Sequence, residues 1–292
     1  MAIRIHCHIR LPKQHKQRTK SMSELIFSLA AGRSGSAWLA KFLEANLGFP
    51  TVHEPFGIDD FGNTMPDIRT MRSFNMRGMD DVVRGFWGRK MASLPKDKPY
   101  AETNHTLGKC GLIETLIDHP RCDDTTVIIL RRNLAKQCAS YIQRNDCGNM
   151  TLLWQWYLAP NYRNVILKPE SFLKMGVVGT ALWYTLEMEC RQHYYEQVYG
   201  DRVRFVHAQL EDVITPEGAR KLLADLGRDQ AATLPPKANA NVAPPDVGLI
   251  DEIDTFLSKT GFDAQALVAQ YLEAGFSLDQ SHKKQPQVAA SS

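Results

Sequence analysis

The chain has 292 residues, of which 43% are apolar and 23% charged, and this composition allows a sizeable core and argues against wholesale disorder. Its formal net charge of only +3 argues against a nucleic-acid-binding protein, which typically carries a strongly basic surface. No apolar run approaches the roughly 20 residues that cross a bilayer, so we expect no transmembrane segment.

The cysteines are scattered, and no two are spaced as Cys-x-x-Cys. They are Cys7, Cys110, Cys122, Cys138, Cys147 and Cys190. This spacing predicts no zinc site, and a disulfide framework is not expected in a chain of this length. We therefore expect reduced thiols, a cytoplasmic location and no bound metal.

Residues 1–23 are basic, and the first acidic residue is Glu24. An Arg-rich, acid-poor start is typical of an organelle transit peptide. Termini are also commonly poorly ordered, which favours a disordered basic tail over residues 1–23. A single domain is expected over residues 24–280, followed by a disordered polar tail at 281–292.

The first predicted element is a buried strand over residues 25–30, which read Leu-Ile-Phe-Ser-Leu-Ala. A turn of small residues follows at 31–36. Apolar residues then recur at three- and four-residue spacing, which predicts one face of a helix that ends at Gly48. These residues are Trp38, Leu39, Phe42, Leu43 and Leu47.

The same strand–turn–helix order returns at residues 125–130, which are apolar on both faces, with Asn133 as a helix N-cap and a helix from 134 to 142. A third strand is predicted at 203–207, between helices over 180–199 and 216–226. Strands that alternate with helices predict an α/β fold: a P-loop-like three-layer sandwich with a central parallel sheet and helices on both faces. We interpret the less regular segments 57–99 and 145–179 as acceptor-binding loops.

The turn after the first strand has the composition of an anion-binding loop. Glycines allow close backbone approach, serines add hydroxyl donors, an arginine adds a planar cation, and the helix N-terminus offers free N–H groups. These residues are Gly32, Arg33, Ser34, Gly35 and Ser36. The tripeptide Gly35-Ser36-Ala37 lacks the lysine and the Mg²⁺-binding hydroxyl of a Walker A motif, which favours an anion held without metal.

Residues 32–38 resemble the 5′-phosphosulfate loop of the PAPS-dependent sulfotransferases, where PAPS is 3′-phosphoadenosine 5′-phosphosulfate. The resemblance implies that Gly32, Arg33, Ser34, Gly35, Ser36, Ala37 and Trp38 bind the donor. It also implies that Arg33 contacts the transferred group, while Ala37 stands where the family usually has a hydroxyl. Trp38 either packs on adenine, as in the cytosolic branch, or belongs to the core face of the helix.

A second segment resembles the family's 3′-phosphate signature. Arg132 and Asn133 follow the second strand, and Ser140, eight residues after Arg132, directly precedes Tyr141. The resemblance implies that Arg132 and Ser140 bind the 3′-phosphate, and ligands do gather at the carboxyl ends of strands in open α/β sheets. Weaker similarities lie at residues 53–56, at 210–213 and at 226–227.

Together these motifs predict a soluble sulfotransferase that moves a sulfuryl group from PAPS to a hydroxyl, with no metal. Two residues are candidates for the base that takes the hydroxyl proton, His105 and Glu54, and Glu102 is a third choice. The acceptor is expected to be a small molecule or carbohydrate, with sugar, lipid, phenol and peptide tyrosine all open. The alternatives are a P-loop small-molecule kinase and a non-catalytic nucleotide-binding relative.

Overall fold

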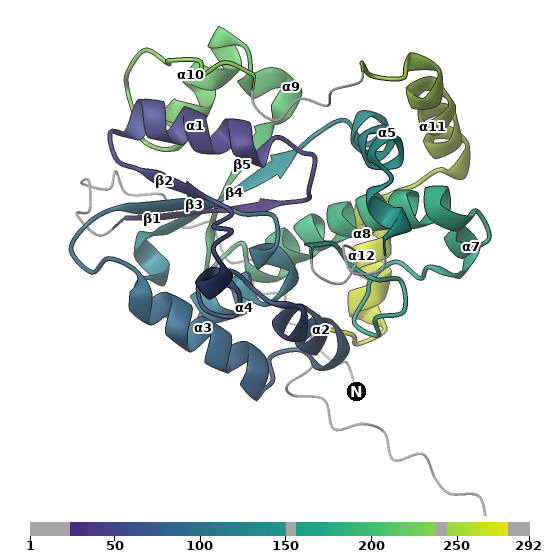
Figure 1. Ribbon diagram of the computed structural model, residues 1–292, viewed down its shortest axis with the longest axis horizontal. Helices are drawn as coiled ribbons and strands as arrows, with labels where there is room; N and C mark the ends of the chain where they lie inside the picture. The colour runs from purple at the N-terminus through teal and green to yellow at the C-terminus, as the bar shows by residue number, and fades with distance from the viewer. Residues whose placement is uncertain (1–23, 150–155, 238–243, 280–292) are drawn as a thin grey trace, which may run out of the picture.

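The computed structural model describes residues 24–149, 156–237 and 244–279, and its centre is a five-stranded sheet (Figure 1). The strand order is β2-β3-β1-β4-β5, and every neighbouring pair is parallel. The strands are β1 (Leu25–Ala30), β2 (Thr51–His53), β3 (Tyr100–Thr103), β4 (Thr125–Arg131) and β5 (Arg204–Gln209).

Helices connect these strands and cover the sheet. Those up to β5 are α1 (Ser36–Leu47), α2 (Ile68–Arg77), α3 (Asp81–Ser93), α4 (Leu112–Leu116), α5 (Leu134–Arg144), α7 (Glu170–Leu173) and α8 (Gly176–Tyr199). Those after it are α9 (Leu210–Val213), α10 (Pro216–Asp225), α11 (Val247–Thr260) and α12 (Ala264–Glu273). Single 3-10 turns lie at Ile58–Asp60, Leu107–Lys109, Cys122–Asp124 and Asp146–Gly148.

Successive side chains of the buried strands point to opposite faces of the sheet, so they pack into two separate cores. Leu25, Phe27 and Leu29 of β1 pack with α3, α4, α12 and the second half of α8. Ile26 and Ala30 point to the opposite face and pack with α1 and α10. Because each face of the sheet is covered, the predicted three-layer α/β sandwich with a central parallel sheet is confirmed.

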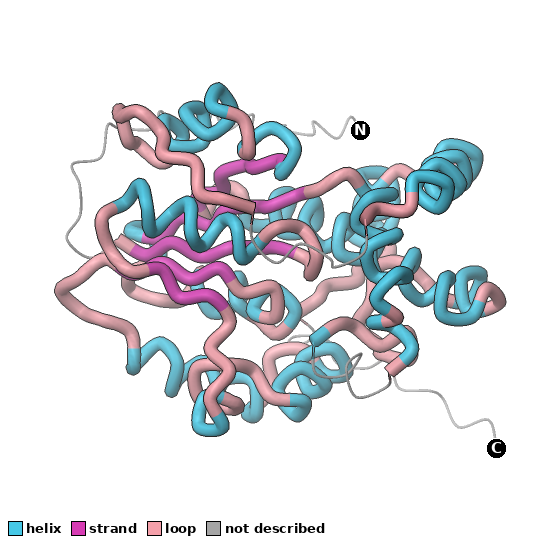
Figure 2. The backbone as a smooth tube through the Cα atoms, turned by 45° about the horizontal axis from the view of Figure 1, so that its top comes forward, coloured by secondary structure: helices cyan, strands magenta, loops and turns pink. Residues whose placement is uncertain are grey.

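A third core lies beside the sheet rather than on it, on the side where β4 ends (Figures 1 and 2). It joins α5, α11 and the first half of α8, and it includes three tyrosines that pack edge to face. These are Tyr141, Tyr157 and Tyr184. This helical part therefore stands directly in front of the loops that follow β1 and β4.

Most predicted elements occur where the pattern placed them. The strands predicted at 25–30, 125–130 and 203–207 are β1, β4 and β5, and the helix predicted at 180–199 begins earlier, at Gly176. Gly48 ends α1 in a left-handed conformation, and the side chain of Asn133 caps α5, as predicted. The predicted tails at 1–23 and 281–292 lie outside the described residues.

The expectation that residues 57–99 form irregular loops was wrong, because this segment contains α2 and α3. Both helices begin at an aspartate whose carboxylate accepts from a backbone N–H three residues later, Asp67 from Thr70 and Asp80 from Val83. The segment 145–179 likewise includes α7 and the start of α8. The short strands β2, at one edge of the sheet, and β3, next to it, were not predicted, nor were the C-terminal helices α11 and α12.

Candidate functional site

The turn between β1 and α1 bends through two residues with positive φ, Arg33 at 58° and Gly35 at 98°. Gly35 is the N-cap of α1 and is left-handed, a conformation that glycine adopts without steric cost. Because glycine has no side chain, Leu210 can pack closely against Gly35: a Cβ there would lie 2.6 Å from Cδ1 of Leu210. The weak motif at 210–213 therefore packs against the turn after β1.

Gly32 is held from the other side by the aromatic part of the third core. A Cβ on Gly32 would lie 3.0 Å from Cε1 of Tyr157 and 3.1 Å from the hydroxyl of Tyr141, so a larger residue would displace these rings. Its carbonyl oxygen accepts hydrogen bonds from Nε2 of Gln137, at 2.7 Å, and from the Tyr141 hydroxyl. Helix α5 thus fixes the conformation of the loop.

The two anion motifs meet at this loop. Arg33 donates from Nε to the hydroxyl of Ser140 at 3.0 Å, and Arg132 donates from Nη1 to the carbonyl oxygen of Arg33 at 2.8 Å. The Nε of Arg132 is buried and has no hydrogen-bond partner among the described residues. Glu211 completes the contact by accepting from the backbone N–H of Asn133 at 3.2 Å.

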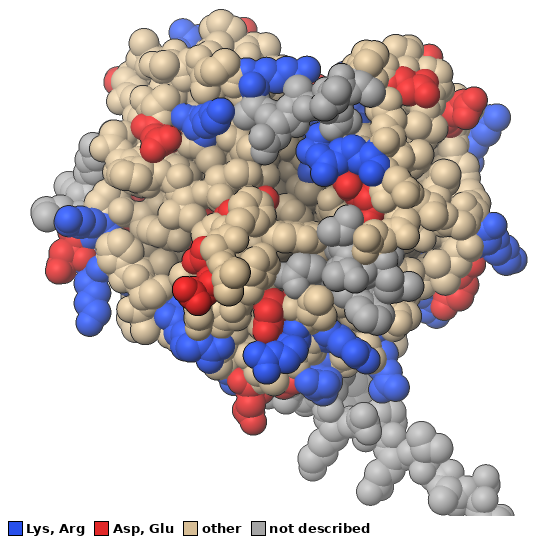
Figure 3. Space-filling view, viewed as in Figure 1, with Lys and Arg blue, Asp and Glu red and all other residues tan. Residues whose placement is uncertain are grey.

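This meeting point is where the chain changes direction across the sheet. From β1 the chain continues to β2 at one edge, and from β4 it continues to β5 at the other edge, although β1 and β4 are neighbours. Open α/β sheets bind ligands outside the carboxyl ends of two such strands. The face seen in Figure 3 is hollowed near its centre, between the regions of α1 and α5, with Lys and Arg side chains beside the hollow.

The guanidinium groups of Arg33 and Arg132 bring two partly buried positive charges to this part of the sheet. Desolvation is the main cause that lowers the pKa of Arg33, and the nearby Arg144 lowers it further. Burial likewise lowers the pKa of Arg132, which Arg33 also lowers and Glu211 raises. Both guanidinium groups stay charged at neutral pH, so this concentration of cations at a helix N-terminus favours an anionic ligand.

The two candidate bases lie opposite each other. Nε2 of His105 is 3.6 Å from Oε1 of Glu54, and this carboxylate oxygen is buried without a hydrogen-bond partner in the described part of the chain. Burial raises the pKa of Glu54 and lowers that of His105 well below its ordinary value. Glu54 also has a positive φ, of 43°. Like Arg33, it therefore occupies a sparsely populated backbone conformation.

Sequence reasoning missed Lys109, which is completely buried four residues after His105. Its Nζ lies 2.8 Å from Nδ1 of His105 and 2.9 Å from the hydroxyl of Tyr184, and it donates to the carbonyl oxygen of Trp156. A buried lysine on a short 3-10 turn has no recognisable pattern in a single sequence. Only the fold brings it to the site.

Glu102, the third candidate base, is engaged elsewhere. Its carboxylate pairs with Nζ of Lys90 at 2.6 Å and accepts from the hydroxyl of Tyr100 at 2.7 Å. The amide of Asn104 donates to it as well, at 3.1 Å. This fully buried carboxylate anchors β3 to α3.

The remaining loop residues have mainly structural contacts. Ser34 donates to the carbonyl oxygen of Ala31 at 2.6 Å, Ser36 is the first residue of α1, and Ala37 is half-buried beside it. Trp38 is 6% exposed, stacks on Phe42 and donates from Nε1 to the carbonyl oxygen of Pro235 at 3.3 Å. Of the two interpretations of Trp38, the structure places the ring in the core.

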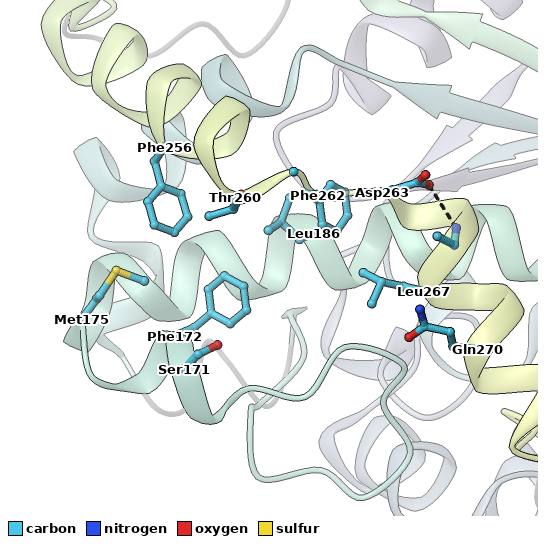
Figure 4. Close-up of a pocket in the computed structure, with 12 residues that line it drawn as sticks. Ser171, Phe172, Met175, Leu186, Phe256, Thr260, Phe262, Asp263, Leu267 and Gln270 are labelled. Carbon is cyan, nitrogen blue, oxygen red and sulfur yellow. Dashed lines mark hydrogen bonds between the residues drawn. The ribbon is translucent and has the colours of Figure 1, made fainter.

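A separate cavity of about 540 Å³ lies between α7, α8, α11 and α12 (Figure 4). Its walls are mostly apolar, and none of the predicted site residues lines it. In residues 24–149, 156–237 and 244–279, no group of three or more His, Cys, Asp or Glu side chains could hold a metal ion. Over the same ranges, no helix is long and apolar enough to cross a membrane.

The fold is similar to a crystal structure of a sulfotransferase from Alicyclobacillus acidocaldarius. The TM-score is 0.44 and the sequence identity 14%, over 88% of this chain and 97% of that chain. No protein-family model and no curated protein matches the sequence. At this degree of likeness, the function has to come from the geometry of the site.

Proposed function

We propose that the protein is a sulfotransferase that transfers a sulfuryl group from PAPS to a hydroxyl, leaving PAP, the donor nucleotide without that group. The observation that carries the proposal is the convergence of Arg33 and Arg132 at the carboxyl ends of β1 and β4. A donor with phosphates at both its 5′ and 3′ positions needs two linked anion sites. A mononucleotide needs only one.

In this proposal, the backbone N–H groups of residues 32–36 and the side chain of Arg33 hold the 5′-phosphosulfate at the start of α1. Arg132 binds the 3′-phosphate, and its Nε, which has no hydrogen-bond partner within residues 24–149, 156–237 and 244–279, supplies a donor for it. Ser140 already bonds Arg33, so it aligns that guanidinium as well as lying near the 3′-phosphate. Trp38 would have to leave Pro235 before it could contact adenine.

Transfer also requires a base for the acceptor's proton, and Glu54 and His105 are the candidates. Oε1 of Glu54 and Nε2 of His105 are 3.6 Å apart beside the loop, and a Cβ added to Gly32 would lie 3.6 Å from Cε1 of His105. An acceptor hydroxyl at this gap would be within reach of either group. Cations at Arg33 and Arg132 would stabilise charge that develops on the leaving phosphate.

The acceptor is proposed to be a small molecule or carbohydrate with a ring. Trp156 lies beside His105, at a ring-centre distance of 6.2 Å, and Phe56 and Phe61 pack edge-on against it at 5.6 and 5.9 Å. Phe56 is 61% exposed. Such aromatic surfaces bind the apolar faces of phenols and sugars alike.

Thermal shifts test the donor directly. PAP is expected to raise the melting temperature more than AMP or ATP–Mg²⁺ at equal concentration, because a ligand stabilises the protein in proportion to its affinity. Equal shifts with PAP and AMP would contradict a 3′-phosphate site. A larger shift with ATP–Mg²⁺ would favour a P-loop kinase, although the turn lacks the Walker lysine.

Turnover separates an enzyme from a non-catalytic relative that still binds PAP. Labelled PAPS with a panel of phenols, sugars and lipid alcohols is expected to give a sulfate ester, and the rate is expected to be unchanged in EDTA. Activity that EDTA abolishes and Mg²⁺ restores would contradict the metal-free mechanism. PAP binding without any turnover across the panel would support the non-catalytic alternative.

A further inference from the structure

The contacts of Lys109 have a consequence for His105. A lysine ammonium has three N–H donors and no acceptor. Nζ of Lys109 has three neighbours that can accept: Nδ1 of His105 at 2.8 Å, the Tyr184 hydroxyl at 2.9 Å and the Trp156 carbonyl oxygen. Each donor of the buried ammonium is therefore matched by one acceptor.

A neutral imidazole carries a single N–H, so its two nitrogens cannot both donate. When Nδ1 accepts from Lys109, the proton must be on Nε2, and Nε2 is the nitrogen that faces Oε1 of Glu54 across 3.6 Å. In this state Nδ1 is occupied by a donor and Nε2 has no lone pair in the ring plane. His105 then has no free site at which to take a proton.

We propose that Lys109 is a positioning residue that holds His105 in the Nε2–H tautomer, so that Glu54, and not His105, takes the proton of the acceptor hydroxyl. The tautomer follows from the contacts of Lys109, while the role of Glu54 rests on the proposed sulfotransferase function. In the transfer step, the acceptor's O–H bond breaks and its proton goes to the Glu54 carboxylate. The acceptor oxygen forms a bond to sulfur as the bond from sulfur to the PAP phosphate oxygen breaks.

The charges around the imidazole favour the same arrangement. Burial is the main cause that lowers the pKa of His105, and Lys109, His53 and Arg33 lower it further. Burial lowers the pKa of Lys109 well below its ordinary value, and the nearby anion Glu54 opposes this shift by favouring the charged form. A carboxylate, a neutral imidazole and an ammonium in a row carry no net charge, which limits the cost of burying them.

The opposite arrangement needs a neutral Lys109 whose lone pair accepts from Nδ1–H. Only two N–H donors would then remain, for the Trp156 carbonyl and the Tyr184 hydroxyl. Nε2 of His105 would then carry a free lone pair directed toward Oε1 of Glu54. Two hydrogen-bond acceptors would face each other at 3.6 Å. This arrangement would make His105 the base.

Nitrogen NMR of the ligand-free full chain, labelled with ¹⁵N-histidine, distinguishes the two tautomers at pH 7. The His105 signals are assigned by their loss in His105→Gln. We expect the proton on Nε2 in the unsubstituted protein. A proton on Nδ1 would overturn the proposal without any Lys109 variant, and independently of whether PAPS is the donor.

Two substitutions extend the test. Lys109→Met is expected to remove the tautomer preference and to lower kcat, by less than the loss of the base Glu54 itself, with PAP affinity within a few-fold. Lys90→Met removes another buried ammonium, one that bonds Thr64 and Glu102 instead, and is expected to leave the His105 signals unchanged. An unchanged tautomer in folded Lys109→Met would refute the positioning role.

Failure of the proposed function gives a different pattern. If the chain is not a sulfotransferase, the unsubstituted protein shows no turnover with PAPS, yet its Nε2–H tautomer remains. If Lys109 has no positioning role, turnover exists and Lys109→Met changes neither kcat nor the spectrum. Should Lys109→Met not fold, Tyr184→Phe removes one acceptor of Nζ, and we expect it to shift the tautomer ratio partway.

Discussion

Arg132 donates a hydrogen bond from its Nη1 to the backbone carbonyl oxygen of Arg33, 2.8 Å away and 99 residues earlier in the chain. The two residues meet because β1 and β4 pair in parallel, with Ala30 opposite Leu130, so that the loops after both strands leave the sheet together. The loop after β4 therefore holds the turn after β1 in place through this bond.

Arg132→Ala is expected to weaken PAP binding by about 10- to 150-fold and AMP binding much less. Hydrogen bonds to charged groups contribute about 1.5–3 kcal/mol, and AMP lacks the 3′-phosphate. Isothermal titration of both nucleotides measures the difference. The adjacent Arg131 is a matched control, because its guanidinium pairs with Glu189 and Glu196, so Arg131→Ala should leave both affinities within a few-fold. Equal losses for PAP and AMP in Arg132→Ala would contradict the 3′-phosphate assignment.

Turnover is expected to rise with pH through a pKa that belongs to Glu54 and lies above the ordinary value for glutamate. Burial raises this pKa, and a general base works only when deprotonated, so the rate falls as pH drops through it. A pH profile of kcat/KM in the unsubstituted protein and in Glu54→Gln makes the measurement. The variant should lose roughly 10²–10⁴ of the rate and the acid limb with it. A limb that persists in Glu54→Gln and disappears in His105→Gln would assign the base to histidine instead.

Gly35→Ala is expected to reduce stability and to weaken PAP binding. The left-handed conformation costs an L-residue about 1–2 kcal/mol, and the new Cβ would also displace the side chain of Leu210. Gly48→Ala is the control: its φ is 75° but no atom lies within 4 Å of the added Cβ. Urea unfolding should show a loss in both variants, and only Gly35→Ala should change PAP affinity. Normal PAP affinity in Gly35→Ala would remove this turn from the donor site.

Glu114→Gln is expected to raise the free energy of unfolding, relative to the unsubstituted protein, by more at pH 8 than at pH 5. Burial raises the pKa of Glu114 from 4.5 to about 7, and one of its oxygens has no hydrogen-bond partner in the described residues. A carboxyl with a raised folded pKa stabilises the fold below its unfolded pKa, and that contribution is lost as pH rises through about 7. Complete ionisation of Glu114 in the folded state lowers the free energy of unfolding by on the order of 3 kcal/mol. Urea titrations of both proteins at the two pH values measure it, and parallel pH dependence would show that Glu114 does not titrate in this range.

The sequence predicted the centre of the fold better than its edges. β1 and β4 are buried on both faces, so their composition is unmistakable, and Gly48 and Asn133 mark the helix boundaries. β2 and β3 have only three and four residues, too few for a period to show. They form because β3 pairs with β1 and then receives β2 at the sheet edge.

For the site, the motifs identified residues but not their partners. Arg33 and Arg132 stood out because arginine follows a buried strand in both cases. Nothing in the chain indicated that Ser140 would bond Arg33, or that Lys109 would reach His105, because these contacts depend on packing between separate elements. The environment that makes Glu54 a buried carboxylate, and Glu102 part of an ion pair, is equally a property of the folded chain.

Helix α8 runs without interruption from the tyrosine cluster beside the turn after β1 to the core beneath the sheet. In its second half, the Gln192 side chain donates to the carbonyl oxygens of Leu29, at 3.0 Å, and Leu130, at 3.2 Å, residues near the ends of β1 and β4. A 24-residue helix, about 36 Å long and free of proline, leaves no hinge between the two parts. If the protein binds PAPS as proposed, nucleotide exchange would therefore proceed by movement of side chains and connecting loops around a rigid frame, and not by the two parts swinging apart.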